Sequence, residues 1–121
     1  MGGIMQYAFD KQTSRLIIYV DGSDSLRIRS AQYKKAFESD RWKPGSDVMI
    51  FISDFYSPPQ LQELDDLYRV FEKHNVRKVA IMTRDVLAEA TADTAKRIAE
   101  LYHIPLKHFA NLQEMLDWIN G

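Results

Sequence analysis

Short apolar runs that alternate with amphipathic stretches restrict the fold of this sequence more than any other feature. The clearest run, residues 47–54, reads Asp-Val-Met-Ile-Phe-Ile-Ser-Asp, and its centre is continuously apolar. A strand of this kind is typical of a parallel sheet that is covered on both faces. Residues 15–20, 76–83 and 104–109 form similar runs, so we expect them to be the other strands of that sheet.

Residues 57–73 predict the clearest helix. Ser57 is expected at the N-cap, with Pro58 at the favoured first position and Gln60 at the third, which is a capping-box arrangement. Large apolar side chains then recur every three or four residues, which favours a helix with one buried face. They are Leu61, Leu64, Leu67, Tyr68 and Phe71. His74, just beyond this helix, is expected to make a favourable contact with the helix dipole.

Three further helices are expected. The first covers residues 25–42 and ends where Pro44 and Gly45 break the helical pattern. Asp85 or Thr91 caps the next, which runs to Tyr102 and packs through Leu87, Ala95, Ile98, Ala99 and Leu101. The last opens at the capping residue Asn111 and has an apolar side made by Leu112, Met115, Leu116 and Ile119.

Residues 4–9 predict one more strand, which a short polar turn separates from residues 15–20, so the two indicate an antiparallel hairpin. From residue 15 onward strands alternate with helices, as in parallel sheets with right-handed crossovers. We therefore predict an α/β fold with the order β-β-α-β-α-β-α-β-α. A single mixed, mainly parallel sheet is led by the hairpin, and helices pack on it. All 121 residues are expected to form one domain, 1–121.

Composition restricts partners and compartment. The net charge is −1, so the chain lacks the basic excess with which nucleic-acid-binding proteins replace phosphate counterions. The chain contains no cysteine, so its composition gives no sign of an oxidising compartment. No apolar run approaches the about 18 residues that a membrane helix needs. The first residues lack the features of a signal peptide. We expect a cytoplasmic protein that neither binds nucleic acid nor inserts into a membrane.

No catalytic or cofactor motif is present. The five glycines are scattered, which excludes the phosphate-binding loops, and no G-x-S-x-G nucleophile elbow occurs. The spacing of His74, His103 and His108 matches no standard zinc motif. We therefore expect a protein that is not an enzyme, with no catalytic residues, no cofactor and no bound metal.

Candidate binding residues follow the predicted strands, because ligands of parallel α/β sheets bind beyond the carboxyl ends of the strands. Asp21, Asp54 and Arg84 stand at three such ends, and Tyr56 and Ser57 lie in the loop after the strongest strand. An aromatic residue in a loop can line an apolar pocket or a partner surface. These aspartates fit equally well the ordinary roles of helix caps and turn residues, and Tyr56 can simply close the end of the sheet.

A magnesium-dependent phosphoacceptor is an alternative reading of the same strand ends, because acidic side chains bind Mg²⁺. Asp21, Asp24, Asp54, Thr83 and Lys107 supply the residue types of a two-component receiver site. The spacing argues against it: one predicted helix separates Asp21 from Asp54, whereas a receiver has two helices and a strand there.

The order of elements resembles the STAS domain, the fold of anti-sigma-factor antagonists, and in detail a divergent bacterial group of STAS-like proteins of unknown function. The matching stretches are 15–22, 47–54, 77–82 and 112–119, the last an acidic and apolar helix that contains Trp118. The resemblance spans nearly the whole chain and rests on pattern and order, without a diagnostic motif.

The resemblance implies a non-catalytic regulatory or binding domain that engages a protein partner or a second copy of itself. In the antagonists, a serine of an Asp-Ser-Ser-Gly segment that opens a helix is phosphorylated by a partner kinase. Ser57 is the residue that this role fits here, although Pro58 and Pro59 follow it in place of that segment. Binding of a small apolar ligand or lipid is a second alternative, and it predicts an interior pocket.

Overall fold

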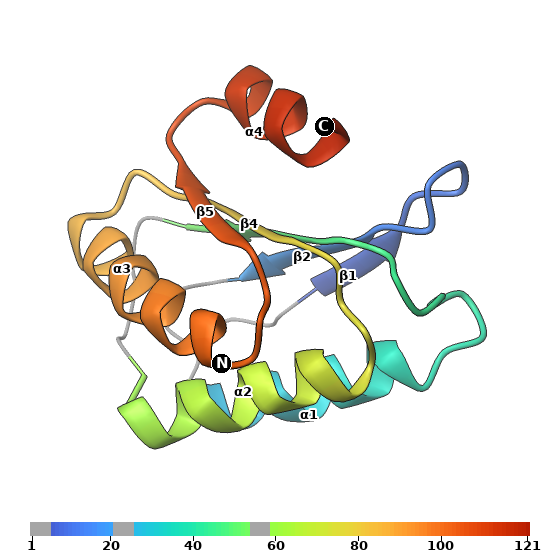
Figure 1. Cartoon of the computed structure of the whole chain (residues 1–121), viewed down its shortest axis with the longest axis horizontal. Helices are drawn as coiled ribbons and strands as arrows, with labels where there is room; N and C mark the ends of the chain where they lie inside the picture. Colours follow the sequence, from blue (N-terminus) through green and yellow to red (C-terminus); the bar gives the residue numbers. More distant parts are fainter. Residues whose placement is uncertain (1–5, 21–25, 54–58) are drawn as a thin grey trace.

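The computed structural model describes residues 6–20, 26–53 and 59–121, with the backbone alone for 26–30. Its five strands form one sheet in the order β1-β2-β3-β4-β5, in which β1 and β2 are antiparallel and the other pairs are parallel (Figure 1). This confirms the predicted fold class. The elements are β1 (Gln6–Phe9), β2 (Leu16–Val20), α1 (Leu26–Phe37), β3 (Val48–Ile52), α2 (Leu61–Lys73), β4 (Val79–Met82), α3 (Val86–Leu101), β5 (Leu106–Phe109) and α4 (Leu112–Asn120).

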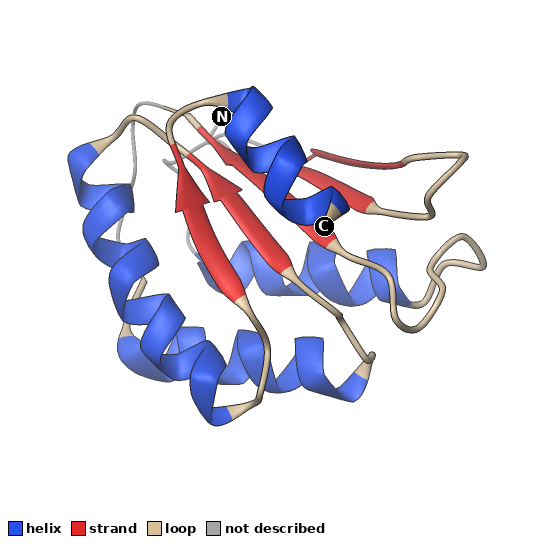
Figure 2. Cartoon of the chain, turned by 45° about the horizontal axis from the view of Figure 1, so that its top comes forward, coloured by secondary structure: helices blue, strands red, loops and turns tan. Residues whose placement is uncertain are grey.

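The helices cover the two faces of the sheet unequally. Helices α1, α2 and α3 lie on one face, and α4 alone lies on the other (Figures 1 and 2). Because side chains alternate along a strand, Leu16, Ile18 and Val20 of β2 join the larger core under the three helices. The smaller core on the α4 face contains Met49, Ala80, Phe109, Met115 and Ile119.

Helix α2 begins later than the sequence pattern predicts. Its N-cap is Gln60, whose backbone N–H donates to the Glu63 carboxylate at 3.0 Å, and Leu61 is its first residue. The expectation that Ser57 caps this helix is therefore wrong. The physical reason lies in the Pro58-Pro59 pair, since a residue that precedes proline is disfavoured in the α conformation.

The other two predicted caps are confirmed. Asp85, rather than Thr91, caps α3: its carboxylate Oδ1 accepts hydrogen bonds from the backbone N–H groups of Leu87 at 2.9 Å and Ala88 at 3.0 Å. Asn111 caps α4 through Oδ1, which accepts from the N–H of Glu114 at 3.1 Å.

Four leucines that the sequence pattern predicts to be buried are exposed in the structure: Leu61, Leu87, Leu101 and Leu112. In α3 the reason is clear, because the buried face consists of alanines at positions 88, 92, 95 and 99. Leu87 and Leu101 lie more than about 100° around the helix from the middle of this alanine stripe. The small side chains allow α3 to approach the sheet closely and turn its two terminal leucines to solvent.

A buried carboxylate joins the amino ends of the parallel strands to the end of α4. Asp47 accepts hydrogen bonds from Nε and Nη2 of Arg77, both at 2.8 Å, and from Nε of Arg15 at 3.3 Å. The same two guanidinium groups also donate to the backbone carbonyl of Ile119, at 3.0 Å and 3.3 Å. Lys78 adds a bond from Nζ to the carbonyl of Trp118 at 3.0 Å. These cations complement the negative end of the α4 dipole.

His74 packs against an aromatic ring at the carboxyl end of α2. It is the C-cap of α2, and its ring stacks on Phe37 with centroids 4.8 Å apart and an interplanar angle of 6°. Burial lowers the pKa of His74 below its ordinary value, and the nearby charge of Lys73 lowers it further. The imidazole therefore serves as a packing group at the end of the helix.

Replacing Asp47 by Asn is expected to lower the free energy of unfolding by about 3 kcal/mol, because two arginines lose the charge that they share. Urea unfolding monitored by circular dichroism measures this loss. The matched control is Asp93→Asn on the exposed surface of α3, which should change stability by less than about 0.5 kcal/mol. Equal stability of the two variants would show that the Asp47 cluster is not a structural anchor.

Stability is also expected to fall as the pH drops through the ordinary pKa of histidine, 6.5. The folded chain protonates His74 only at lower pH, whereas the unfolded chain gains its proton near that value, so acid favours unfolding. An NMR titration should place the His74 midpoint below 6.5, and His74→Asn should weaken the loss of stability between neutral and mildly acidic pH. A midpoint above 6.5 would contradict this account.

Candidate functional site

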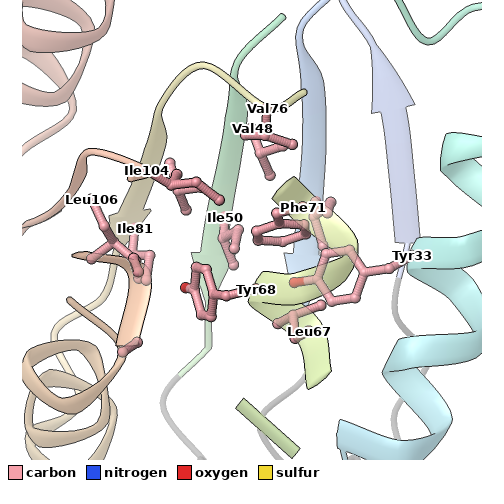
Figure 3. Close-up of a cluster of buried hydrophobic side chains, with 14 of the residues drawn as sticks. Tyr33, Val48, Ile50, Leu67, Tyr68, Phe71, Val76, Ile81, Ile104 and Leu106 are labelled. Carbon is pink, nitrogen blue, oxygen red and sulfur yellow. The ribbon is translucent and has the colours of Figure 1, made fainter. Parts of the chain in front are cut away.

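An apolar cavity of about 40 Å³ lies between the sheet and the three-helix layer, toward the carboxyl ends of the parallel strands. Figure 3 labels five of its lining residues, Tyr33, Leu67 and Tyr68 from the helices and Ile50 and Ile81 from the sheet, and shows the Tyr68 ring beside the two isoleucines. Its lining consists of Val20, Tyr33, Ile50, Ile52, Pro59, Leu64, Leu67, Tyr68, Ile81, Ala88, Thr91, Ala92 and Ala95.

The cavity follows from the composition of α3. Three alanines of its buried stripe, Ala88, Ala92 and Ala95, form one wall, and each ends at Cβ. The large side chains of α2 and the isoleucines of the sheet form the opposite walls and do not fill the remaining space. Close packing normally leaves few such voids in a protein interior.

The lining is chemically uniform. Among the lining residues that the structure describes, only Tyr33, Tyr68 and Thr91 carry a side-chain polar atom, and none of these described residues carries a charge. Such a surface can stabilise a bound group through dispersion contacts and the hydrophobic effect. It provides no opposite charge to offset the desolvation of a charged group. It therefore suits a neutral, apolar group.

Three exposed aliphatic side chains, which we call the rim, lie in the first turns of α2 and α3. They are Leu61 (66% exposed), Val86 (76%) and Leu87 (54%). Leu61 stands between the lining residues Pro59 and Leu64, and Val86 and Leu87 directly precede the lining residue Ala88. The rim thus occupies the first turns of α2 and α3, at the end of the sheet where the sequence predicts binding.

Of the five predicted binding residues, Arg84 alone lies in the described part of the chain. It is exposed and follows β4, as expected. Asp21, Asp54, Tyr56 and Ser57 lie outside the described residues. The expected grouping of these five side chains therefore stays a prediction, as does phosphorylation of Ser57, whose predicted place at the N-cap of α2 is wrong.

Polar groups at the end of β4 have structural roles. Thr83 is buried, and its hydroxyl oxygen accepts a hydrogen bond from the N–H of Asp85 at 3.1 Å. Asp85 in turn caps α3. Lys107 pairs with Ala80 in the sheet and places its ammonium group 5.5 Å from the centre of the Phe109 ring. Because Ala80 precedes Thr83 by three residues, Lys107 lies about 10 Å along the sheet from the level of Thr83.

Within 6–20, 26–53 and 59–121 no group of three or more His, Asp or Glu side chains is arranged to hold a metal ion. In the same part of the chain, no helix combines the length and the apolar character needed to cross a membrane.

Sequence reasoning missed the rim and named only Ala95 and Ala99 of the alanine wall. It assigned Leu61 and Leu87 to the core because large apolar residues at helical spacing are usually buried. The signal that identifies the wall is the spacing of Ala88, Ala92, Ala95 and Ala99, which repeats every three or four residues along one face of α3. Three of these four alanines, Ala88, Ala92 and Ala95, line the cavity.

Comparison with known proteins supports the fold and leaves the activity open. No family model and no curated protein matches the chain. Among solved structures it is similar to an uncharacterized protein of the DUF3478 family with a SpoIIAA-like fold from Shewanella loihica PV-4. The identity is 16%, the TM-score is 0.60, and the match covers 98% of this chain and 95% of that one. The chain therefore has a SpoIIAA-like fold, which is the STAS-like architecture that the order of its elements indicates.

Proposed function

We propose that this chain is a non-catalytic, cytoplasmic binding domain that holds a protein partner at the carboxyl end of its sheet. The observation that carries the proposal is the rim, in which Leu61, Val86 and Leu87 expose aliphatic surface in the first turns of the helices that follow β3 and β4. A regulatory role of the kind found in anti-sigma-factor antagonists agrees with the STAS-like fold. A second copy of the chain is the other protein partner that this surface suits.

The energetics of the rim favour a protein partner. Full burial of a side chain of this size is worth roughly 1.5–3 kcal/mol, so three together contribute on the order of 5 kcal/mol before the costs of association. Exposed apolar surface at a binding end of a fold typically marks an interaction site. Single exposed leucines are common, and it is the place of these three just after the carboxyl ends of parallel strands, where ligands of such sheets bind, that supports the proposal.

A second candidate function is the capture of a small apolar molecule, and the cavity is the observation that favours it. Its uncharged lining would hold such a molecule without any polar anchor. This function needs no contact with the rim, so variants of the rim separate the two candidates.

The rim is expected to carry partner binding. The double variant Leu61→Ser/Val86→Ser should remain folded, because both side chains are exposed, and should lose a stoichiometric partner in native mass spectrometry of the chain isolated from its host. The control is Leu101→Ser, which alters a 73% exposed leucine at the other end of α3 and should keep the partner. Loss of the partner from both variants, or from neither, would contradict a role of the rim.

The same spectra test the second candidate. A chain that carries a small molecule and no protein would favour ligand capture. A chain that carries neither would count against both functions.

Magnesium is expected to leave the midpoint of thermal unfolding unchanged, because the groups described at the end of β4 already cap α3 or lie away from the strand end. A ligand that binds the folded state alone raises this midpoint as its concentration rises. Stabilisation by Mg²⁺ that is absent from Asp54→Asn would instead support the phosphoacceptor alternative.

A further inference from the structure

We infer that a second pocket, which we call the basic pocket, binds a small molecule through a phosphate monoester group. The pocket lies between the turn that joins β1 to β2 and the loop that joins α1 to β3, which extend on the same side of the molecule (Figures 1 and 2). Its volume is about 240 Å³, and its lining consists of Phe9, Asp10, Lys11, Ser14, Arg41 and Lys43. The inference goes beyond the proposed function, because it concerns another surface.

The basic pocket lies at the amino end of the parallel strands, away from the rim. Phe9 pairs with Leu16, the first residue of β2. Gln6 pairs with Tyr19 near the other end of β2, where Val20 is the last residue described before 26. The length of β2, about 13 Å, separates the two ends. All six lining residues belong to the described part of the chain.

Three cations lie around this pocket without an acidic partner. Lys11, Arg41 and Lys43 are exposed, and within the described residues none of them forms an ion pair. Glu38 and Asp40, which are close to Arg41 in the sequence, do not line the pocket. The positive charge of the lining therefore remains available to a ligand.

The one carboxylate of the lining, that of Asp10, is engaged in the β1–β2 turn. Its Oδ1 accepts hydrogen bonds from the backbone N–H groups of Gln12 at 2.8 Å and Thr13 at 3.3 Å. These bonds lower the pKa of Asp10 below its ordinary value, so the group is ionised at neutral pH. Three positive charges and one negative charge give the lining a net charge of +2.

The loop that carries two of the cations is anchored between them. Trp42 follows Arg41 and precedes Lys43, and its side chain is buried. Its Nε1 donates a hydrogen bond to the carbonyl of His74 at 3.2 Å, and its ring packs edge-on against Phe37 with centroids 4.8 Å apart. A ligand therefore meets a backbone that is already fixed, which lowers the entropy lost on binding.

Charge and volume together indicate a phosphate monoester. Such a group carries about −1.5 to −2 charges at neutral pH, which matches the +2 of the lining, whereas a carboxylate carries a single charge. Arginine binds phosphate oxygens in a bidentate manner, and lysine binds them as a point charge. The volume is below the about 300 Å³ at which pockets for larger organic ligands begin. Half-buried Phe9 offers an apolar wall to the organic part of a small ester.

The test is a titration of the full chain with phenyl phosphate, followed by amide NMR signals. We expect saturable shifts at residues 9–14 and 41–43, which inorganic phosphate reproduces and benzoate at equal ionic strength does not. Arg41→Gln should weaken binding about tenfold, because it removes a charge-assisted pair of donors. This variant should unfold at the wild-type temperature, since Arg41 is exposed. The matched control is Arg97→Gln at an exposed position of α3, which should bind normally.

A phosphate monoester can belong to a soluble molecule or to a lipid headgroup, and vesicles distinguish the two sources. Binding to phosphatidylcholine vesicles that contain phosphatidic acid, weakened in Arg41→Gln and kept in Arg97→Gln, would assign the group to a lipid. Binding of phenyl phosphate without binding to these vesicles would assign it to a soluble ester.

Other outcomes would overturn the inference. They are the absence of saturable shifts, an equal response to benzoate, and equal weakening in the Arg41 and Arg97 variants. The rim variant Leu61→Ser/Val86→Ser should bind phenyl phosphate like the wild type, so the fate of the proposed function and that of the basic pocket are decided separately.

Discussion

The buried carboxylate of Asp47 is the interaction on which the rest of the structure depends. Its side chain is only 5% exposed, and such a charge is tolerated in an interior only when it is paired and fully hydrogen-bonded. Arg15 precedes β2, Asp47 precedes β3 and Arg77 precedes β4, so one charge cluster fixes the amino ends of three parallel strands. The same guanidinium groups hold the carbonyl of Ile119, which positions α4, the sole helix on its face of the sheet.

The charge cluster and the candidate site thus lie at opposite ends of the sheet. The amino ends of the strands carry the charge cluster, while the carboxyl ends carry the cavity and the rim. This separation leaves the binding end tolerant of change, because substitutions at exposed Leu61 or Val86 touch no part of the Asp47 cluster. Helix α3 spans both ends: its alanine stripe packs against the sheet along its length, and the residues before Ala88 form part of the rim.

The alternation of apolar runs and amphipathic stretches was enough to predict the order of the elements, because each strand is short, apolar and bounded by turn residues. The caps Asp85 and Asn111 were predictable because a cap acts within four residues. The Asp47 cluster could not be predicted, because its contacts join residues that are far apart in the sequence. Arg15 is 32 positions from Asp47 and 104 positions from Ile119. The late start of α2 could have been predicted, because the Pro58-Pro59 pair disfavours a helix at that point. The apparent capping box from Ser57 to Gln60 led to the earlier start instead. The candidate site lies at the carboxyl end of the sheet, where it was expected. The described residues of this site are apolar, whereas the sequence analysis expected acidic ones.

An empty cavity and an exposed rim are both unfavourable for the isolated chain. A void deprives its lining of dispersion contacts, and grouped aliphatic side chains in water favour association. Covering the rim would remove the second penalty, and filling the cavity would remove the first. Under the proposed function a partner binds the folded chain alone, so its binding would also add to the stability of the fold, in proportion to the logarithm of its concentration relative to Kd. The features that weaken the free domain are thereby the places where a complex would gain most.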